Sequence, residues 1–127
     1  MSYESIFKLD LFQNKLVVVT GGGSGIGRCT AHELAALGAT VVITGRQAEK
    51  LENVATEIES DGGAVDFLAF DIRDGVAVAE QVDEILRRHG KIDGLVNNAG
   101  GQFPARLEDI SQNGWNAVVA TNLTGGF

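Results

Sequence analysis

Short apolar runs alternate with helical spacings along the chain. Apolar runs cover residues 15–20, 40–44, 64–71 and 92–97, each short enough for a strand buried in a parallel sheet. Between these runs, apolar residues recur three, four and seven positions apart, as on one face of an amphipathic helix. This spacing is clearest in the second interval, at Leu51, Val54, Ala55 and Ile58. The pattern predicts strands and helices in regular alternation.

Glycines and a serine mark the ends of the predicted helices. Gly38 follows a helix over 25–37, residues 61–63 (D-G-G) close the second helix, and Gly90 ends the third. Ser111 is the expected N-cap of a further helix, which has no stop signal before Phe127. We therefore expect the last element to be cut.

Alternating strands and helices imply a fold of the α/β class. Strands joined through helices lie parallel, and the crossovers are right-handed, so we expect a doubly wound parallel sheet. In such sheets ligands bind at the carboxyl ends of the strands, beside the point where the strand order reverses. That edge is where residues with chemistry should gather.

The segment between the first strand and the first helix is rich in glycine. Residues 20–27 read T-G-G-G-S-G-I-G. Free N–H groups at a helix start favour anions, and glycines let a diphosphate approach the backbone closely. The spacing is G-x-x-x-G-x-G, which differs from the common G-x-G-x-x-G pattern. Taken alone, the run predicts a dinucleotide turn or an ordinary strand-to-helix turn.

The end of the second strand bears on the choice of cofactor. An acid there accepts the ribose hydroxyls of NAD, whereas a guanidinium can hold the 2′-phosphate of NADP. The sequence is Thr44-Gly45-Arg46, with Arg46 19 positions after Gly27. NADP is therefore expected, with NAD less favoured, and a surface arginine is the alternative interpretation of Arg46. Arg28 and Lys50 are further candidates for positive charge, or surface residues.

Four motifs occur in order along the chain. The glycine run at 20–27 is followed by Asp71 after the third strand, by residues 97–100 (N-N-A-G) at the end of the fourth, and by residues 122–125 (N-L-T-G) in the last helix. Together they resemble the short-chain dehydrogenase/reductase family over residues 12–127. The resemblance implies a Rossmann-type doubly wound sheet, of which this chain supplies the N-terminal part. It divides the chain into an extension, 1–13, and a dinucleotide-binding domain, 14–127.

The resemblance also implies roles for individual residues. The pyrophosphate would be held by Gly21, Ser24, Gly25, Ile26 and Gly27. Asp71 would accept a hydrogen bond from the adenine amine. Its neighbour Ile72 would belong to the same cofactor site. Without the family context, Asp71 would be interpreted as a solvated turn acid.

The two asparagine motifs carry the remaining roles. Asn98, Ala99 and Gly100 match the family segment that steadies the sheet and lines the adenosine ribose. Asn122 matches the asparagine of the catalytic tetrad, which holds a helix irregularity and anchors a water of the proton relay. Its alternative interpretation is an amide in a helix interior.

The family's catalytic tyrosine and lysine have no counterpart in this sequence. Tyr3 is the only tyrosine, and Phe7 stands four positions after it. Family members are about twice as long, so we expect this sequence to be the N-terminal half of an enzyme, ending before the catalytic segment. The expected function is an NADP(H)-dependent short-chain oxidoreductase acting on a carbonyl, alcohol or enoyl substrate. A catalytically inactive nucleotide-binding module is the alternative, and a methyltransferase is disfavoured because Gly45-Arg46 offers no acid.

Two stretches of the sequence resemble particular members of the family. Residues 98–103 and 114–116 are similar to peroxisomal-type trans-2-enoyl-CoA reductases and to bacterial enzymes of terpenoid alcohols such as citronellol. The likeness implies an extended apolar substrate. Family members are commonly dimers or tetramers, so we expect a homo-oligomer.

Composition excludes several other classes of function. The formal charge of −7 disfavours a nucleic-acid partner, and no metal-ligand cluster is evident. No signal peptide or membrane-spanning stretch is seen, so we expect a cytoplasmic protein with a small-molecule substrate. Cys29 has no disulfide partner and is expected to be a small buried helix residue, and His32 and His89 are expected to be solvated.

Overall fold

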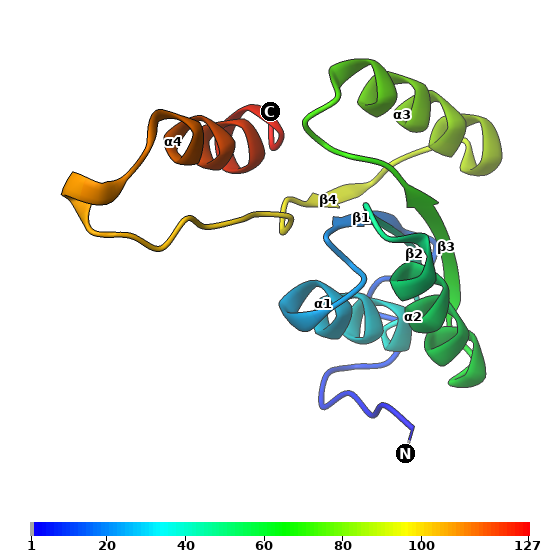
Figure 1. Ribbon diagram of the computed structural model, residues 1–127. Helices are drawn as coiled ribbons and strands as arrows, with labels where there is room; N and C mark the ends of the chain where they lie inside the picture. Colours follow the sequence, from blue (N-terminus) through cyan, green and yellow to red (C-terminus); the bar gives the residue numbers. More distant parts are fainter. Residues whose placement is uncertain (1) are drawn as a thin grey trace.

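The computed structural model describes residues 2–127 as a four-stranded sheet with helices on both faces (Figure 1). The elements are β1 (Leu16–Thr20), α1 (Gly25–Ala36), β2 (Thr40–Gly45), α2 (Ala48–Ser60), β3 (Ala64–Ala69), α3 (Gly75–His89), β4 (Gly94–Val96), a 3-10 turn (Leu107–Asp109), α4 (Gln112–Val119) and a π-helical turn (Ala120–Thr124). The alternation of strands and helices predicted from the sequence is confirmed.

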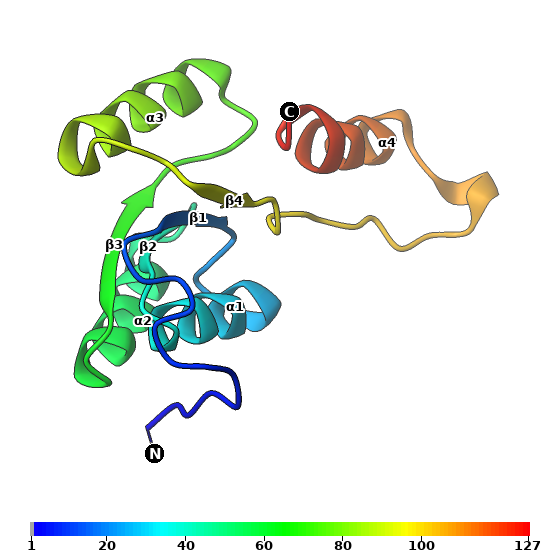
Figure 2. The ribbon, with the colours of Figure 1, turned by 180° about the vertical axis from the view of Figure 1, so that it is seen from behind.

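All strand pairs are parallel, and the strand order is β3-β2-β1-β4. The chain runs outward from β1 to β3 and then returns to place β4 on the other side of β1, so the order reverses between β1 and β4. Helices α1 and α2 cover one face of the sheet, and α3 covers the other (Figures 1 and 2). A doubly wound sheet of this kind binds ligands at the reversal.

Alternate residues of the central strands pack into two apolar layers. Val19, Val41 and Ile43 face α1 and α2, where the predicted stripe of α2 is buried against them. Val18 and Val42 face α3, whose buried contribution to that layer is Ile85. Both faces of β1 and β2 are therefore covered, as their continuous apolar runs predict.

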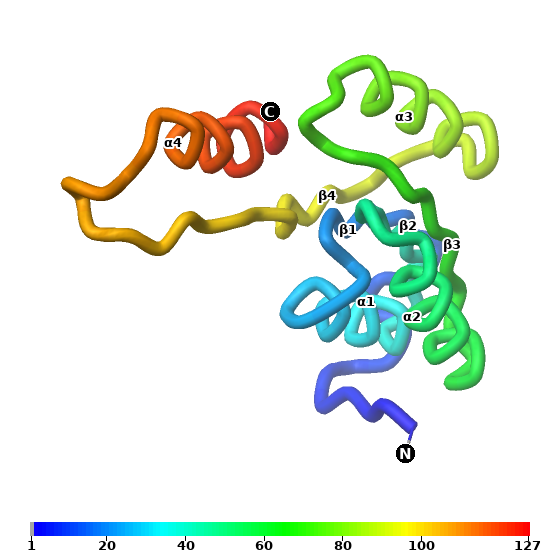
Figure 3. The backbone as a smooth tube through the Cα atoms, viewed as in Figure 1, coloured from blue at the N-terminus to red at the C-terminus, as the bar shows by residue number. Residues whose placement is uncertain are grey.

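The chain leaves the sheet after β4 in a long extended segment and returns through α4 (Figure 3). Its end lies beside the loop that follows β3, because a Cβ on Gly125 would meet Ile72 Cδ1 at 3.0 Å. Asn97 Nδ2 also donates to the carbonyl of Gly126 at 3.1 Å. The C-terminal turn therefore packs against the carboxyl edge of the sheet.

Most predicted helix signals are confirmed, whereas the third and fourth strands are shorter than predicted. Gly90 adopts a left-handed φ of 78° after α3, and Ser111 Oγ accepts from the Gly114 N–H at 3.0 Å at the start of α4. The predicted strands 64–71 and 92–97 shorten to β3 and β4. At the end of β3, the Phe70 N–H donates to the Gly45 carbonyl, and the chain then turns at Asp71.

Three smaller expectations were wrong. Cys29 is exposed, because the face of α1 that meets the sheet carries Ala31 and Ala35. The His32 side chain is only 11% exposed, and its Nε2 lies 2.9 Å from Glu57 of α2. His89 Nε2 lies 3.0 Å from Asp66. Each histidine therefore contacts a carboxylate of a neighbouring element. Separately, no helix within residues 2–127 is long and apolar enough to cross a membrane.

The start of α3 provides a test of the fold. The Asp74 side chain accepts from the N–H groups of Val76 and Ala77, both at 3.1 Å. Asp74→Ala is expected to lower the free energy of unfolding by about 1 kcal/mol, while Asp74→Asn, which keeps an acceptor, should cost much less. Chemical denaturation of the full-length protein measures both. Equal stability of Asp74→Ala and the unmodified protein would contradict the capping role.

Candidate functional site

A pocket of about 490 Å³ lies at the carboxyl edge of the sheet, where the strand order reverses. Nearly all of the residues predicted to bind a cofactor line it, although they come from four separate parts of the sequence. These residues are Gly21, Ser24, Gly25, Ile26, Arg46, Asp71, Ile72, Asn98, Ala99 and Gly100. Gly27 and Asn122, also predicted as site residues, are not part of the lining.

The glycine run forms a tight turn, here called the cradle, in which side chains at two positions would collide with neighbouring atoms. Gly21 has φ +69°, and a Cβ there would lie 2.9 Å from Asn98 Nδ2. A Cβ on Gly27 would lie 2.2 Å from the Gly21 carbonyl oxygen. Gly27 therefore allows α1 to pack against the turn, which explains why it is needed although it does not face the pocket. Gly25, at φ +54°, has no atom within 4 Å of a Cβ position, so the turn stays open there.

Hydrogen bonds from Thr20 and Asn98 join the glycine run to β4. Thr20 Oγ1 accepts from the N–H groups of Asn98 at 3.0 Å and Ala99 at 2.9 Å, and it donates to Val96 O at 3.3 Å. Asn98 Nδ2 donates to Thr20 O at 3.0 Å and to Gly21 O at 3.3 Å. The Asn98 side chain thus fixes the turn. Sequence analysis included Thr20 in the motif at 20–27 but assigned it no role.

The start of α1 leaves backbone donors free at the pocket. Ser24 occupies the N-cap position, but its side chain makes no cap hydrogen bond. The first N–H groups of a helix need partners from outside the helix, and the helix dipole favours an anion there. The open cradle and these donors together fit a diphosphate.

Thr44, one of the residues that line the pocket, has a buried hydroxyl without a hydrogen-bond partner in the described part of the chain. Thr44 is 1% exposed, and its Oγ1 makes no hydrogen bond within residues 2–127. An unpaired buried polar group costs about 1–3 kcal/mol, so a polar ligand in the pocket could relieve this cost. Thr44 pairs with Thr20 across the sheet, and sequence analysis assigned it no role either. An orphan hydroxyl fits a dinucleotide, which is rich in donors and acceptors.

The pocket contains one carboxylate, and that carboxylate is paired. Arg73 Nη2 lies 2.6 Å from Asp71 Oδ2, and Arg73 Nε donates to both Asp71 oxygens at 3.0 Å. These side-chain bonds, helped by the backbone N–H of Arg73 and by the charge of Arg46, lower the pKa of Asp71 to about 2. Asp71 therefore remains an ionised acceptor at neutral pH.

Asn122 lies beside the pocket, inside the π-helical turn that follows α4. Its Nδ2 donates to the carbonyls of Gly101 at 2.7 Å and Val118 at 2.9 Å, and its Oδ1 accepts from the Gly101 N–H at 3.2 Å. The helix irregularity expected at this asparagine is present. Asn122 joins the last helix to the segment that follows Gly100, so its position and that of the pocket wall are coupled.

The described residues offer no metal site beside this pocket. Within residues 2–127, no group of three or more His, Cys, Asp or Glu side chains could hold a metal ion. The chemistry of the pocket consists of backbone donors, hydroxyls, one paired carboxylate and cations.

Solved structures of other proteins share this arrangement of strands and helices. The citronellol catabolism dehydrogenase of Pseudomonas aeruginosa PAO1 superposes with a TM-score of 0.94 at 58% identity, covering 98% of this chain and 51% of that protein. A metagenomic short-chain oxidoreductase in complex with NADP superposes with a TM-score of 0.84 at 40% identity, covering 90% of this chain and 52% of that protein. The Rossmann-type sheet is thereby confirmed.

Sequence comparison gives the same assignment. A probable 2,4-dienoyl-CoA reductase of Bacillus subtilis is 38% identical over 115 residues, which is 91% of this chain and 45% of that protein. The chain spans about half the length of the relatives it matches. The family model for short chain dehydrogenases matches residues 15–127. The chain therefore belongs to the short-chain dehydrogenase family, whose members are oxidoreductases that bind NAD or NADP.

Proposed function

We propose that the protein is an NADP(H)-dependent oxidoreductase and that the pocket described above holds its cofactor. The observation that carries the proposal is the convergence of the glycine cradle, Arg46 and Asp71 on one pocket at the strand-order reversal. A relative of 40% identity has been solved with NADP, which supports the same cofactor here.

Each part of the proposed site has a distinct task. Backbone N–H groups of the cradle bind the pyrophosphate, and Asp71 accepts a hydrogen bond from the adenine amine. The Arg46 guanidinium pairs with the 2′-phosphate, since a planar fork of donors matches phosphate oxygens. Asn98 acts through the backbone of Thr20 and Gly21, keeping the cradle in shape. When bound, NADPH would supply the hydride.

The residues that hold or move a proton are only partly present in this sequence. Hydride transfer to a carbonyl needs a proton donor within hydrogen-bond reach of the oxygen. Tyr3 is not that donor, because its hydroxyl donates to Glu33 of α1 and its ring packs beside His32, outside the pocket. Asn122 is the one residue that we assign to the proton relay, and the proposal leaves the donor itself unassigned.

We propose an extended apolar substrate carrying a carbonyl, an alcohol or a conjugated alkene. Support comes from the two relatives reported above, one a citronellol catabolism dehydrogenase and the other a probable 2,4-dienoyl-CoA reductase. Turnover of citronellol with NADP⁺ and of 2,4-dienoyl-CoA with NADPH separates these substrates. Tight NADPH binding without turnover of any carbonyl, alcohol or enoyl substrate would favour the alternative, a nucleotide-binding module without catalysis.

Arg46 sets the first test. Arg46→Gln removes the guanidinium and should weaken NADPH binding by about tenfold to a hundredfold, because hydrogen bonds to charged groups contribute about 1.5–3 kcal/mol. NADH binding should stay within about twofold, since NADH has no 2′-phosphate. Calorimetric titration of the full-length protein measures both affinities. Arg28→Gln is the matched control, because Arg28 pairs with Glu57 outside the pocket. Equal losses for NADPH and NADH would count against the role of Arg46.

The Asp71–Arg73 pair sets a test in pH. Because the pKa of folded Asp71 lies near 2, below its ordinary value of 3.8, the pair stabilises the fold fully above pH 3.8 and loses this effect as the pH falls through about 2. Arg73→Gln should raise the pKa of Asp71 toward 3.8. A ¹³C NMR titration of the Asp71 carboxyl measures the change, with Arg106→Gln as the remote control. An unchanged pKa in Arg73→Gln would refute the pairing.

Asn122 sets a test of the relay. Asn122→Ala should lower kcat by about a hundredfold while leaving NADPH affinity within about threefold, since general acid–base groups contribute about 10²–10⁴-fold. Steady-state kinetics and cofactor titration of the full-length enzyme give the two values. Asn116→Ala, an exposed change on α4, is the control. An unchanged kcat would show that Asn122 takes no part in the relay. A lower kcat accompanied by a loss of thermal stability would indicate that Asn122 acts structurally, through its hydrogen bonds with Gly101.

A further inference from the structure

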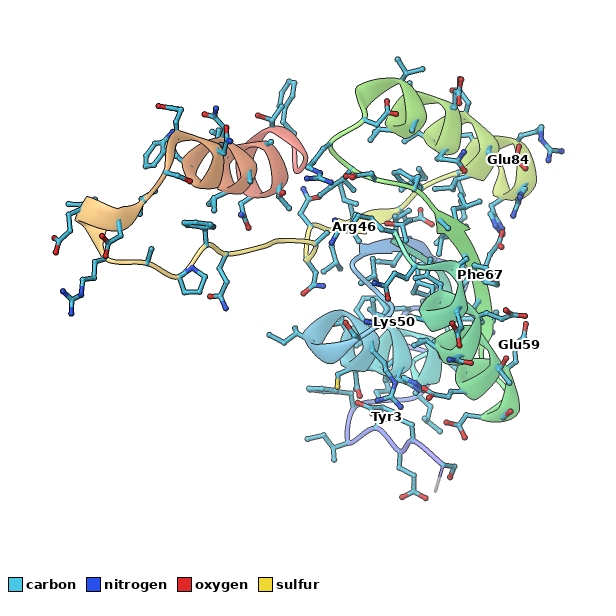
Figure 4. The ribbon with its side chains drawn as sticks, in the orientation of Figure 1. Tyr3, Arg46, Lys50, Glu59, Phe67 and Glu84 are labelled. Atoms are coloured by element: carbon cyan, nitrogen blue, oxygen red, sulfur yellow. The ribbon has the colours of Figure 1, made fainter. Side chains whose placement is uncertain are left out.

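The segment that leaves the pocket wall after Gly100 is fixed to the C-terminal helix at two points. The N–H and the carbonyl of Gly101 both bond to the Asn122 side chain, at 3.2 Å and 2.7 Å. Two residues later, the Phe103 ring lies against Gly114 of α4, because a Cβ on Gly114 would meet three ring atoms at 2.7–2.9 Å. Figures 1 and 2 show the segment and α4 side by side, and Figure 4 shows side chains between them.

Gly114 is an unusual residue for its position. It lies inside α4, where it is buried, although only proline is less favourable than glycine in a helix interior. A glycine inside a helix usually has a packing or functional reason. Here the reason is Phe103, whose ring occupies the space that a side chain on Gly114 would need. Contact with this ring is therefore maintained at a cost in helix propensity.

The direction of the Phe103 side chain follows from the two fixed points. Pro104 comes next in the sequence and restricts the backbone of Phe103 to extended conformations. An extended chain advances at most about 7 Å over two residues, whereas the eight positions from Gly114 to Asn122 span about 12 Å of helix. The side chain of Phe103 covers the difference. Its ring is thus held in one place by the backbone on one side and by α4 on the other.

This fixed ring lies next to the proposed reaction site. Gly100, Gly101 and Thr121 line the pocket, and Asn122, which we assign to the proton relay, bonds to Gly101. Phe103 is the first large apolar side chain that the segment presents beyond this wall. It is 46% exposed, although part of its ring rests on α4. An apolar surface is therefore available beside the polar pocket.

We propose that Phe103, seated on Gly114, forms an apolar wall of the substrate site and contacts the carbon chain of the substrate. A rigid ring offers a large apolar contact area and suits an extended carbon chain. Gly114 is a positioning residue in this proposal, because it acts through the ring and does not touch the substrate. The inference rests on the proposed function, since it assumes that an apolar substrate reacts beside Asn122.

Replacement of the ring tests the wall. Phe103→Leu should raise the KM about tenfold for the substrate that the unmodified protein turns over, citronellol or 2,4-dienoyl-CoA. The affinity for NADPH and the kcat should stay within about threefold, because a wall contact is equally strong in the ground state and the transition state. Leu107→Ala, an exposed change in the same segment, should alter none of these values. Steady-state kinetics and calorimetry of the full-length protein measure them.

Binding without turnover gives a second measurement. Citronellol cannot react with NADPH, and 2,4-dienoyl-CoA cannot react with NADP⁺, so calorimetric titration of these complexes measures substrate affinity alone. Phe103→Leu should lower this affinity about tenfold, in agreement with the change in KM. Leu107→Ala should leave it unchanged.

Displacement of the ring tests the role of Gly114. Gly114→Ala places a Cβ where the Phe103 ring lies, while alanine favours the helix, so the variant should fold. We expect the same rise in KM as for Phe103→Leu, and little further rise in the double variant, because residues in contact have non-additive effects. Gly75→Ala is the matched control, since a Cβ there meets no atom within 4 Å. Thermal unfolding verifies that each variant is folded.

The outcomes separate this inference from the function on which it rests. If Phe103→Leu leaves the KM and the substrate affinity within twofold, the ring only packs the segment against α4, and the inference alone fails. A loss of kcat and of NADPH affinity together with the rise in KM also contradicts it, because the pocket itself would be disturbed. If the unmodified protein neither binds nor turns over either substrate, the proposed substrate class is wrong and the inference fails with it.

Discussion

The hydrogen bonds between Thr20 and Asn98 hold together the two strand ends on which the whole pocket depends. β1 and β4 separate at this point, since one continues into α1 and the other into the long segment toward α4. The Thr20 hydroxyl accepts hydrogen bonds from the N–H groups of Asn98 and Ala99, which follow β4. In the other direction, the Asn98 side-chain amide donates to the carbonyls of Thr20 and Gly21 at the end of β1. Each strand end is thus shaped by the other. Gly21 and Gly27 permit this close packing, because a Cβ on either would collide with Asn98 or with the Gly21 carbonyl.

Around this junction, basic side chains and helix N-termini lie close together, although the chain as a whole is acidic. Two helices begin at the pocket without side-chain caps, while the two that begin elsewhere are capped. The single carboxylate of the lining, Asp71, is paired with Arg73, and the other charged lining residues, Arg46 and Lys50, form no ion pair within residues 2–127. The first N–H groups of these helices lack side-chain partners, which a bound phosphate would supply.

The sequence predicted the fold well because the signals for strands, helices and turns are local. Periodicity identified α2 through Leu51 and its neighbours, and the sequence motifs together with Arg46 identified half of the residues that line the pocket. Properties that depend on how elements pack were harder to predict. Cys29 and His32 lie on one helix, and only the contact between α1 and α2 decides that His32 reaches Glu57 while Cys29 is exposed. The missing hydrogen bond of Thr44 likewise has no sequence signal.

A crystal structure of the full-length protein with NADP⁺ tests the central claim most directly. The account predicts the pyrophosphate over the N–H groups of residues 21–27, the adenine amine beside Asp71, and the 2′-phosphate within hydrogen-bond distance of Arg46. A cofactor bound at another place, or a 2′-phosphate that faces away from Arg46 into solvent, would contradict it.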